Sequence, residues 1–468
     1  MKLNLAKFKT PNTYAILSSI LILMAALTWI MPGAKYDRIE VNGRQVVDPA
    51  TFAYVEATPQ SVGDVLMAPI RGFERAAEII GFVLLIGGVF GILTKTRAIE
   101  AGVQSLAKAH KSSALIRSIT IPLFMVLFSL GGATFGMSEE TIPFILIFVP
   151  MAYALGYDTI TGIAIPFVGA GAGFAGAFFN PFTVGVAQGI AEVPLFSGLA
   201  YRGLCWSVIT LVAIVFVMRH ASRVKADPKS SLTFERDEEG RKELHLQDAN
   251  SLEDMTRTHR YVLTIFGLGL LLLVYGVLEL DWYIQEIAGL FLLIGVLAAV
   301  VSRLSVDDTT HAFILGAETL VGTALVIALA RAILVIAEDG HIIATILHFL
   351  AGTVEDFHPV VSAQFMFVLQ TVLNFFVPSG SGQAALTMPI MAPLADLVGI
   401  TRQTAVLAFQ FGDGFSNLII PTSGVCMGVL SLAGIPWDKW VRWIIKLELL
   451  FLLVGFLLLI PPVLMGWN

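Results

Sequence analysis

Long apolar runs, separated by short polar stretches, set the pattern of this chain. A helix that crosses a membrane needs about 20 predominantly apolar residues. Nine runs are candidate spans, at residues 13–33, 78–97, 159–196, 200–222, 260–280, 283–303, 318–338, 402–436 and 441–464. Two further segments, 117–157 and 358–398, are apolar but are interrupted near the middle by small and polar residues. The pattern predicts an all-α polytopic membrane protein with about nine transmembrane helices and two interrupted segments.

The composition agrees with a lipid environment. Only 14% of the 468 residues are charged, 56% are hydrophobic, and the mean hydropathy is +0.81. Soluble proteins carry about 25% charged residues, so this chain has too few to cover its surface in water. The formal net charge of −6 gives no indication of a nucleic-acid partner. Cys205 and Cys426 lie in apolar stretches without CxxC spacing, which predicts buried thiols.

Lysine and arginine orient the spans, because short cytoplasmic loops are enriched in these residues. The linker 223–258 and the loop between residues 95 and 117 carry several of them and are expected in the cytoplasm. If the N-terminus is also cytoplasmic, both loops lie inside only when segment 117–157 enters and leaves on one side. That segment is therefore predicted to be a re-entrant hairpin. The linker also carries acidic residues and is predicted to be solvated and mobile, and whether it is regulatory stays open.

The apolar run from Tyr14 to Met31 follows basic residues, as in a signal peptide, but no small-residue cleavage site follows it. We interpret it as an uncleaved first span. The loop 34–64 then lies outside the cytoplasm, where Val46–Pro49 and Phe52–Val55 are expected to form a short hairpin.

The two halves of the chain match at a nearly constant offset, which indicates an internal repeat. The offset is 243 positions for Ser138 and Ser381, for Pro150 and Pro393 and for Gly156 and Gly399, 244 for Gly72 and Gly316, and 240 for Pro181 and Pro421. Span 78–97 runs inwards and its partner 318–338 runs outwards, so the repeat is inverted and 358–398 is the second re-entrant hairpin. Inverted repeats of this kind are typical of transporters, with the site near the bilayer midplane.

The middle of each hairpin carries hydroxyls and exposed backbone. The tips are residues 131–141, with Ser138, Glu139 and Glu140, and residues 374–383, with Ser379, Ser381 and Gln383. A helical arm that begins at Ser138 or Ser381 would present free N–H groups to an anion. The two glutamates would instead hold a cation or cap the helix. We expect one to be a cap only and at least one to contact substrate or a coupling ion, because carboxylates at membrane depth are expensive.

Two spans are broken by proline. The break in 159–196 covers residues 179–183 and includes Asn180 and Thr183, and the break in 402–436 covers residues 417–424 and includes Asn417, Thr422 and Ser423. Proline removes a helical hydrogen bond and frees a carbonyl. Freed carbonyls and hydroxyls can coordinate Na⁺. We therefore predict a candidate Na⁺ site near Asn180, Ser381, Asp413 and Thr422, with plain proline kinks as the alternative.

Two ionisable residues lie within predicted spans. Asp413 is the clearest intramembrane acid and is predicted to bind H⁺, Na⁺ or a cationic group of the substrate. Arg331 is an isolated base, for which we expect a structural partner such as Glu318 or Glu338, with snorkelling or anion binding as the alternatives.

Other motifs exclude some classes of function. Residues 171–176 read GxGxxG, but no soluble strand precedes them, so close helix packing explains these glycines better than a dinucleotide site. The sequence has no Walker A motif, nucleophile elbow or HExxH motif, which argues against an ATP-driven pump or a membrane hydrolase. No cofactor is expected beyond Na⁺ or H⁺ as a coupling ion.

Several stretches resemble the YfcC family. They are Gly136–Glu140, Asn180–Phe182, Val186–Ile190, Asn374–Phe376, Ser379–Pro389 and Phe409–Ser416. The resemblance covers nearly the whole chain, with departures at Ser138, where a glycine can stand, and in the glycine-rich residues 169–176. That family is grouped with the anaerobic four-carbon dicarboxylate carriers, is described as candidate basic amino-acid antiporters, and is similar to the wider ion-transporter superfamily.

The resemblance implies secondary active transport in a bacterial inner membrane by a homodimer. It also implies an elevator motion of a transport domain against a fixed scaffold. The scaffold would comprise residues 1–112 and connecting spans within 199–357, and the transport domain residues 113–198 and 358–437, with 438–468 as the last span.

The substrate is expected to be a small charged metabolite. The acids Glu139, Glu140 and Asp413 favour a basic amino acid such as arginine or ornithine. The helix starts and hydroxyls favour Na⁺- or H⁺-coupled uptake of a four-carbon dicarboxylate or other organic anion, in which the acids serve the ion. A channel or a receptor is the alternative from another class, and it would show currents or signalling without exchange of substrates.

Overall fold

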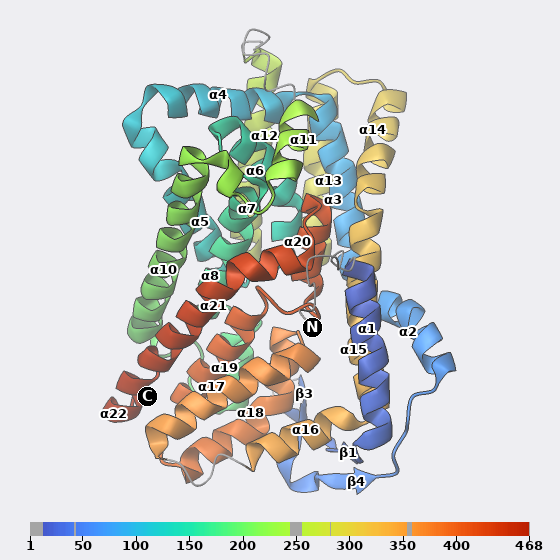
Figure 1. Ribbon diagram of the computed structural model, residues 1–468, viewed down its shortest axis with the longest axis vertical. Helices are drawn as coiled ribbons and strands as arrows, with labels where there is room; N and C mark the ends of the chain where they lie inside the picture. The colour runs from blue at the N-terminus through green and yellow to red at the C-terminus, as the bar shows by residue number, and fades with distance from the viewer. Residues whose placement is uncertain (1–12, 42–43, 244–254, 281, 353–357, 468) are drawn as a thin grey trace, which may run out of the picture.

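The computed structural model describes residues 13–467 except 42–43, 244–254, 281 and 353–357, and nearly all of its elements are helices (Figure 1). The helices up to the linker after α10 are α1 (Thr13–Ile30), α2 (Val62–Arg75), α3 (Ala77–Lys95), α4 (Ala98–Ser112), α5 (Ala114–Phe135), α6 (Thr141–Leu155), α7 (Thr159–Ile163), the π-helical turn η3 (Ala164–Val168), α8 (Gly169–Ala175), α9 (Val184–Ile190) and α10 (Leu199–Ala226). The remaining helices are η4 (Pro228–Ser230), α11 (Phe234–Glu243), α12 (Arg257–Glu279), α13 (Ile284–Val301), α14 (Val306–Thr319), α15 (Val321–Asp339), α16 (Ile342–Ala351), α17 (Pro359–Phe376), α18 (Gly380–Leu397), α19 (Arg402–Ser416), α20 (Gly424–Ala433), α21 (Trp437–Leu458) and α22 (Ile460–Met465).

Eight segments within the described residues are helical, long and apolar enough to cross a membrane. They include α5 and α17, which are the first arms of the two predicted hairpins. The two spans with proline breaks consist of shorter pieces, α7 to α9 and α19 to α20, as the sequence indicated. Cys205 and Cys426 are free and fully buried, as predicted. The chain is therefore a multi-pass membrane protein.

Four short strands lie after α1, and they pair differently from the prediction. β1 (Gly33–Lys35) pairs with β4 (Ala53–Val55), and β2 (Arg38–Val41) pairs with β3 (Arg44–Val47). The two stretches expected to pair with each other thus belong to separate two-stranded sheets. The turn η2 (Pro49–Thr51) lies between them, and the Asp48 side chain accepts the Ala50 N–H at its start, so the chain redirects before β4.

Two helix pairs lie where the re-entrant hairpins are predicted. α5 and α6 both contact α4, while α17 and α18 both contact α16 at the opposite end of the molecule (Figure 1), and the entry of each pair into the membrane from one side stays a prediction. The second arms begin at other residues than predicted. α6 begins at Thr141 rather than Ser138, because Gly136 takes a left-handed conformation and residues 137–140 form the turn. α18 begins at Gly380 rather than Ser381.

The packing follows the inverted repeat. α2 packs on α15 while α3 packs on α14, and α5 packs on α8 while α17 packs on α19. The repeats also exchange partners, since α6 packs on α20 and α18 packs on α9. In Figure 1, α4 and α16 lie at opposite ends of the molecule, so the two hairpins approach its middle from opposite sides. The hairpin tips and both helix breaks consequently meet at mid-depth.

Glycines let the hairpin arms and the broken helices approach closely. A Cβ at Gly173 would lie 1.8 Å from the Ser129 carbonyl oxygen, and a Cβ at Gly414 would lie 2.4 Å from Ala175 Cα. Within the GxGxxG stretch, Gly176 abuts the backbone of Trp206 in the same way. These contacts confirm helix packing as the reason for the motif.

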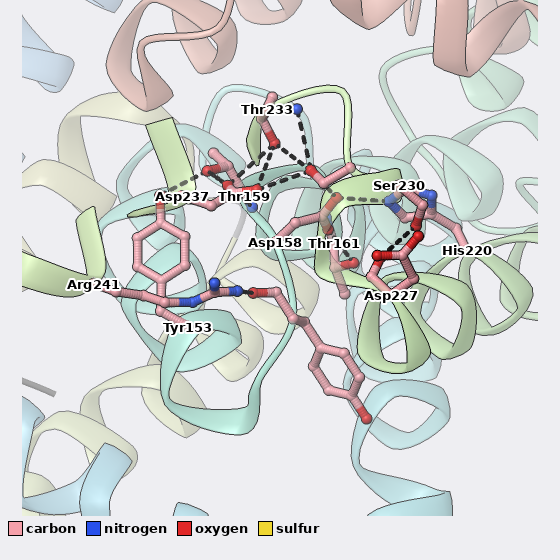
Figure 2. Close-up of polar contacts among 12 residues, drawn as sticks. Tyr153, Asp158, Thr159, Thr161, His220, Asp227, Ser230, Thr233, Asp237 and Arg241 are labelled. Atoms are coloured by element: carbon pink, nitrogen blue, oxygen red, sulfur yellow. Dashed lines mark hydrogen bonds and ion pairs between the residues drawn. The ribbon is translucent and has the colours of Figure 1, made fainter. Parts of the chain in front are cut away.

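The linker after α10 is not freely solvated along residues 227–243, which corrects the sequence prediction. Asp237 of α11 accepts hydrogen bonds from the Thr159 N–H and hydroxyl, and Ser231 donates to Asp158 or Asp237, which it reaches at 2.9 and 2.8 Å (Figure 2). His220 of α10 completes the cluster, with its Nε2 2.9 Å from Asp158. Burial raises the pKa of Asp237 above its ordinary value. The prediction failed because it counted charges without seeing that these acids meet hydroxyls and free helix N–H groups. Residues 244–254 lie outside the described residues.

Candidate functional site

One cavity lies where the hairpin tips and the helix breaks meet, with a volume of about 140 Å³. All four segments singled out from the sequence contribute to it. Its polar lining residues from these segments are Ser138, Glu139, Glu140, Thr183, Ser379, Ser381, Asn417, Thr422 and Ser423. Other elements also line it, through Ile79 of α3, Tyr283 just before α13, and Ile327 and Arg331 of α15. Nine of the twelve predicted site residues therefore share one space.

The two hairpin glutamates differ in their surroundings. Glu140 is buried and its Oε2 accepts a hydrogen bond from the Ser138 N–H at 3.0 Å, so it stabilises the turn before α6. Glu139 is half-buried, and within the described residues its carboxylate has no hydrogen-bond or ion-pair partner. The expected helix cap is not observed, because no side chain caps the first turn of α6 and Glu140 instead accepts the Ser138 N–H within the preceding turn. Glu139 is the carboxylate that is left free to meet a ligand.

Asp413 lies directly behind the cavity and does not line it. Its Oδ1 accepts a hydrogen bond from Asn417 Nδ2 at 3.0 Å, whereas its Oδ2 is buried without a partner. A Cβ at Gly380 would lie 2.9 Å from that Oδ2 and 2.4 Å from Thr183 Cγ2, so Asp413 faces the start of α18 and the break before α9. Asn180 is also behind the cavity, where its Oδ1 accepts from the Phe182 N–H at 2.9 Å and packs on Gly136.

Several buried side-chain oxygens at or near the cavity have no hydrogen-bond partner among the described residues. Besides Asp413 Oδ2, they are Thr183 Oγ1, Thr422 Oγ1 and Asn374 Oδ1, on side chains that are at most 2% exposed. Buried oxygens without a donor are costly, and a carboxylate with hydroxyl and amide oxygens is a donor set for a hard cation. The residues present therefore fit a Na⁺ ion.

The carbonyls of the second break are less available than the sequence indicated. The Leu418 carbonyl accepts from Trp440 Nε1 and the Ile419 carbonyl accepts from Trp437 Nε1, both at 2.8 Å. A cation at this break would therefore rely on side-chain oxygens and on the other carbonyls.

Gln383 is the predicted site residue that the structure places elsewhere. Its side chain is fully buried inside the second hairpin, where Nε2 donates to Gln370 Oε1 at 2.7 Å and to the Gln370 carbonyl at 2.9 Å. It sits one turn inside α18 and faces α17, so its amide joins the two arms rather than lining the cavity.

Sequence reasoning missed the opposite wall of the cavity. Arg331 was expected to have a structural partner, yet Glu338 pairs with Arg75 at 3.0 Å, and no ion pair of Arg331 occurs within the described part of the chain. An isolated base in a span was a signal for this residue. Tyr283 carried no such signal, because it lies between two helices and enters the cavity only through the packing of α13, beside the ring of Phe182 at 5.0 Å.

The sequence matches one family model over residues 10–463, that of DcuC, described as C4-dicarboxylate anaerobic carrier. It is 36% identical to YfcC of Escherichia coli (strain K12), named as a candidate basic amino acid antiporter, over 99% of this chain and 98% of that protein. It is also 30% identical to an uncharacterised protein of Haemophilus influenzae over 97% of each chain.

Two solved structures are similar along almost the whole chain. The YdaH transporter of Alcanivorax borkumensis is 16% identical with a TM-score of 0.45, covering 98% of this chain and 99% of that one. MtrF of Neisseria gonorrhoeae, from a class of antimetabolite efflux pumps, is 17% identical with a TM-score of 0.43, covering 97% and 95%.

Proposed function

Because the chain belongs to the DcuC family of C4-dicarboxylate anaerobic carriers and is a YfcC homologue, we propose that it exchanges a basic amino acid such as arginine or ornithine. The family makes the chain a membrane transporter rather than an enzyme. The finer assignment, to secondary active transport of a basic amino acid, rests on the charges in the cavity.

The carrying observation is that the cavity combines two carboxylates with one guanidinium. Glu139 and Glu140 come from the first hairpin tip and Arg331 from α15. A basic amino acid at neutral pH carries two cationic groups and one carboxylate, which is the complementary set. A ligand whose cationic groups meet the glutamates and whose carboxylate meets the arginine has complementary charge, which gives binding specificity. The name of the Escherichia coli relative supports the same class of substrate.

The second candidate is uptake of a four-carbon dicarboxylate or a similar organic anion, which the family description supports. Arg331, the serine hydroxyls and the N-terminus of α18 could bind one carboxylate. The glutamates would then face a second carboxylate unless they hold protons or a cation. This reading therefore requires the acids to serve the coupling ion.

Na⁺ is the proposed coupling ion, because the oxygens around Asp413 lack other partners. The ion would be held by Asp413, Thr183 and neighbouring oxygens. Its positive charge would attract oxygens both at the start of α18 and at the break before α9, and would so hold these two segments together. We expect both hairpins and both broken spans to move as one body against α1, α3, α13 and α15. That elevator motion and the homodimer are implied by the resemblance to the wider superfamily.

The test is counterflow in proteoliposomes, with labelled arginine or labelled fumarate outside and unlabelled arginine, ornithine, fumarate, lactate or citrate inside, each with and without Na⁺. Internal arginine or ornithine should accelerate uptake, and internal fumarate should not. Exchange of fumarate without exchange of arginine would establish the second candidate instead. Asp413→Asn should abolish the Na⁺ dependence, whereas Asp307→Asn, an exposed acid on α14, should leave it unchanged.

A further inference from the structure

Arg331 is a cationic residue of α15 that lines the cavity. It lies one turn after Ile327 on the same helix, and both side chains line the cavity. α15 itself packs on α1, α2 and α20. The acids at its far end are already paired with α2, through Arg71 with Asp339 and Arg75 with Glu338. Within the described residues, the Arg331 guanidinium forms no hydrogen bond or ion pair.

Arg331 also remains separate from the acids across the cavity. Glu139 lines the same space and has no partner of its own, yet no ion pair joins the two side chains among the described residues. An unpaired charge at membrane depth is expensive. The cavity is therefore lined by free charges of opposite sign, Glu139 from the first hairpin tip and Arg331 from α15.

The chemistry of the two groups assigns the ends of such a ligand. A guanidinium binds a carboxylate through two parallel N–H···O bonds, which gives both strength and orientation. Glu139 accepts only and suits an ammonium or guanidinium. Glu140 is less available, since one of its oxygens already accepts the Ser138 N–H.

Resting on the proposed function, we propose that Arg331 is the specificity residue that binds the carboxylate of the amino-acid substrate, while Glu139 binds its side-chain cation. The protein then requires both ends of the ligand. A basic amine that lacks the carboxylate loses the contact with Arg331 and is bound much more weakly than the amino acid.

The experiment measures binding of arginine and of agmatine, its decarboxylated form, by ligand-induced thermal stabilisation of the purified full-length protein. Wild type should bind agmatine at least about tenfold more weakly than arginine. Arg331→Gln should weaken the binding of arginine by about tenfold or more and change the binding of agmatine by less than about twofold. Arg75→Gln, a matched arginine that pairs with Glu338 outside the cavity, should change neither.

The outcomes separate the two proposals. If wild type neither exchanges nor binds arginine, the proposed function fails. If wild type exchanges arginine but binds agmatine equally well, or if Arg331→Gln weakens both ligands alike, only the role of Arg331 is refuted. If Arg331→Gln does not give monodisperse protein, Arg331→Lys is tested in its place. Lysine keeps the charge but loses the bidentate contact, so the preference for arginine over agmatine should become smaller.

Discussion

Replacing Gly380 by alanine would place a methyl group in the space beside the Asp413 carboxylate. The added Cβ would lie 2.4 Å from Thr183 Cγ2 and 2.9 Å from Asp413 Oδ2, both shorter than normal contacts. Thr183 lies in the first break and Asp413 in α19, and both side chains are buried, so neither can move into solvent. The substitution therefore tests whether a cation binds next to the free Oδ2.

The expected magnitude follows from the cost of overpacking. Inserting a methyl group into a packed site typically costs about 1–3 kcal/mol. If that strain opposes the binding of an ion beside Asp413 Oδ2, Na⁺ affinity should decrease by about 5- to 150-fold, since 1.4 kcal/mol corresponds to a factor of ten. The variant should still fold, because the affected atoms are side-chain atoms of short residues.

The assay is the Na⁺ concentration that gives half of the maximal thermal stabilisation of the purified protein, with choline chloride holding the ionic strength constant. Gly185→Ala is the matched control, because its added Cβ would lie at an ordinary 3.5 Å from the ring of Phe196. A half-maximal concentration within twofold of wild type for Gly380→Ala would refute the placement of the ion beside Asp413. A wild type that does not respond to Na⁺ would refute Na⁺ coupling itself.

Two further predictions concern the cluster around Asp158 and Asp237 and the proposed motion. Burial raises the pKa of Asp158, but hydrogen bonds from His220 and Thr161 outweigh this, and the net pKa lies below the ordinary value. A carboxylate of this kind stabilises the fold above its unfolded pKa of about 3.9 and loses that contribution as the pH falls through its folded pKa. Asp158→Asn should therefore lower the free energy of unfolding by about 1.5–3 kcal/mol between about pH 8 and about pH 5, as measured by denaturant titration. The difference between variant and wild type should disappear only below about pH 4, and its disappearance near neutral pH would contradict this. For the elevator motion, Phe182→Cys, combined with Tyr283→Cys or with cysteines along α15, should cross-link at two depths that depend on substrate and Na⁺, whereas one depth under all conditions would contradict it.

Much of the architecture was predictable because it depends on local sequence. Apolar runs set the spans, and polar residues within apolar segments marked both hairpin tips. Prolines at 181 and 421 marked both helix breaks, since proline cannot continue the helical hydrogen-bond pattern. The charge rule required the first hairpin, and the repeat supplied the second. The exact helix starts were missed by one to three residues, because the tip conformation depends on how each tip meets the opposite half of the chain.

The sequence by itself thus determined the class of protein, the two hairpins, the two breaks and most of the residues that gather around one cavity. The tertiary structure alone decided which of those residues line the cavity and which support it. Asp413 lies behind the wall and Gln383 turns into its own hairpin, while Arg331 and Tyr283 enter from the other side. Only the tertiary structure shows that the linker after α10 binds the start of α7 through Asp237. The reason is that the direction of a side chain and its partners depend on contacts between separate elements, such as Gln370 with Gln383 across the second hairpin and Thr159 with Asp237 of the linker, which no local pattern records.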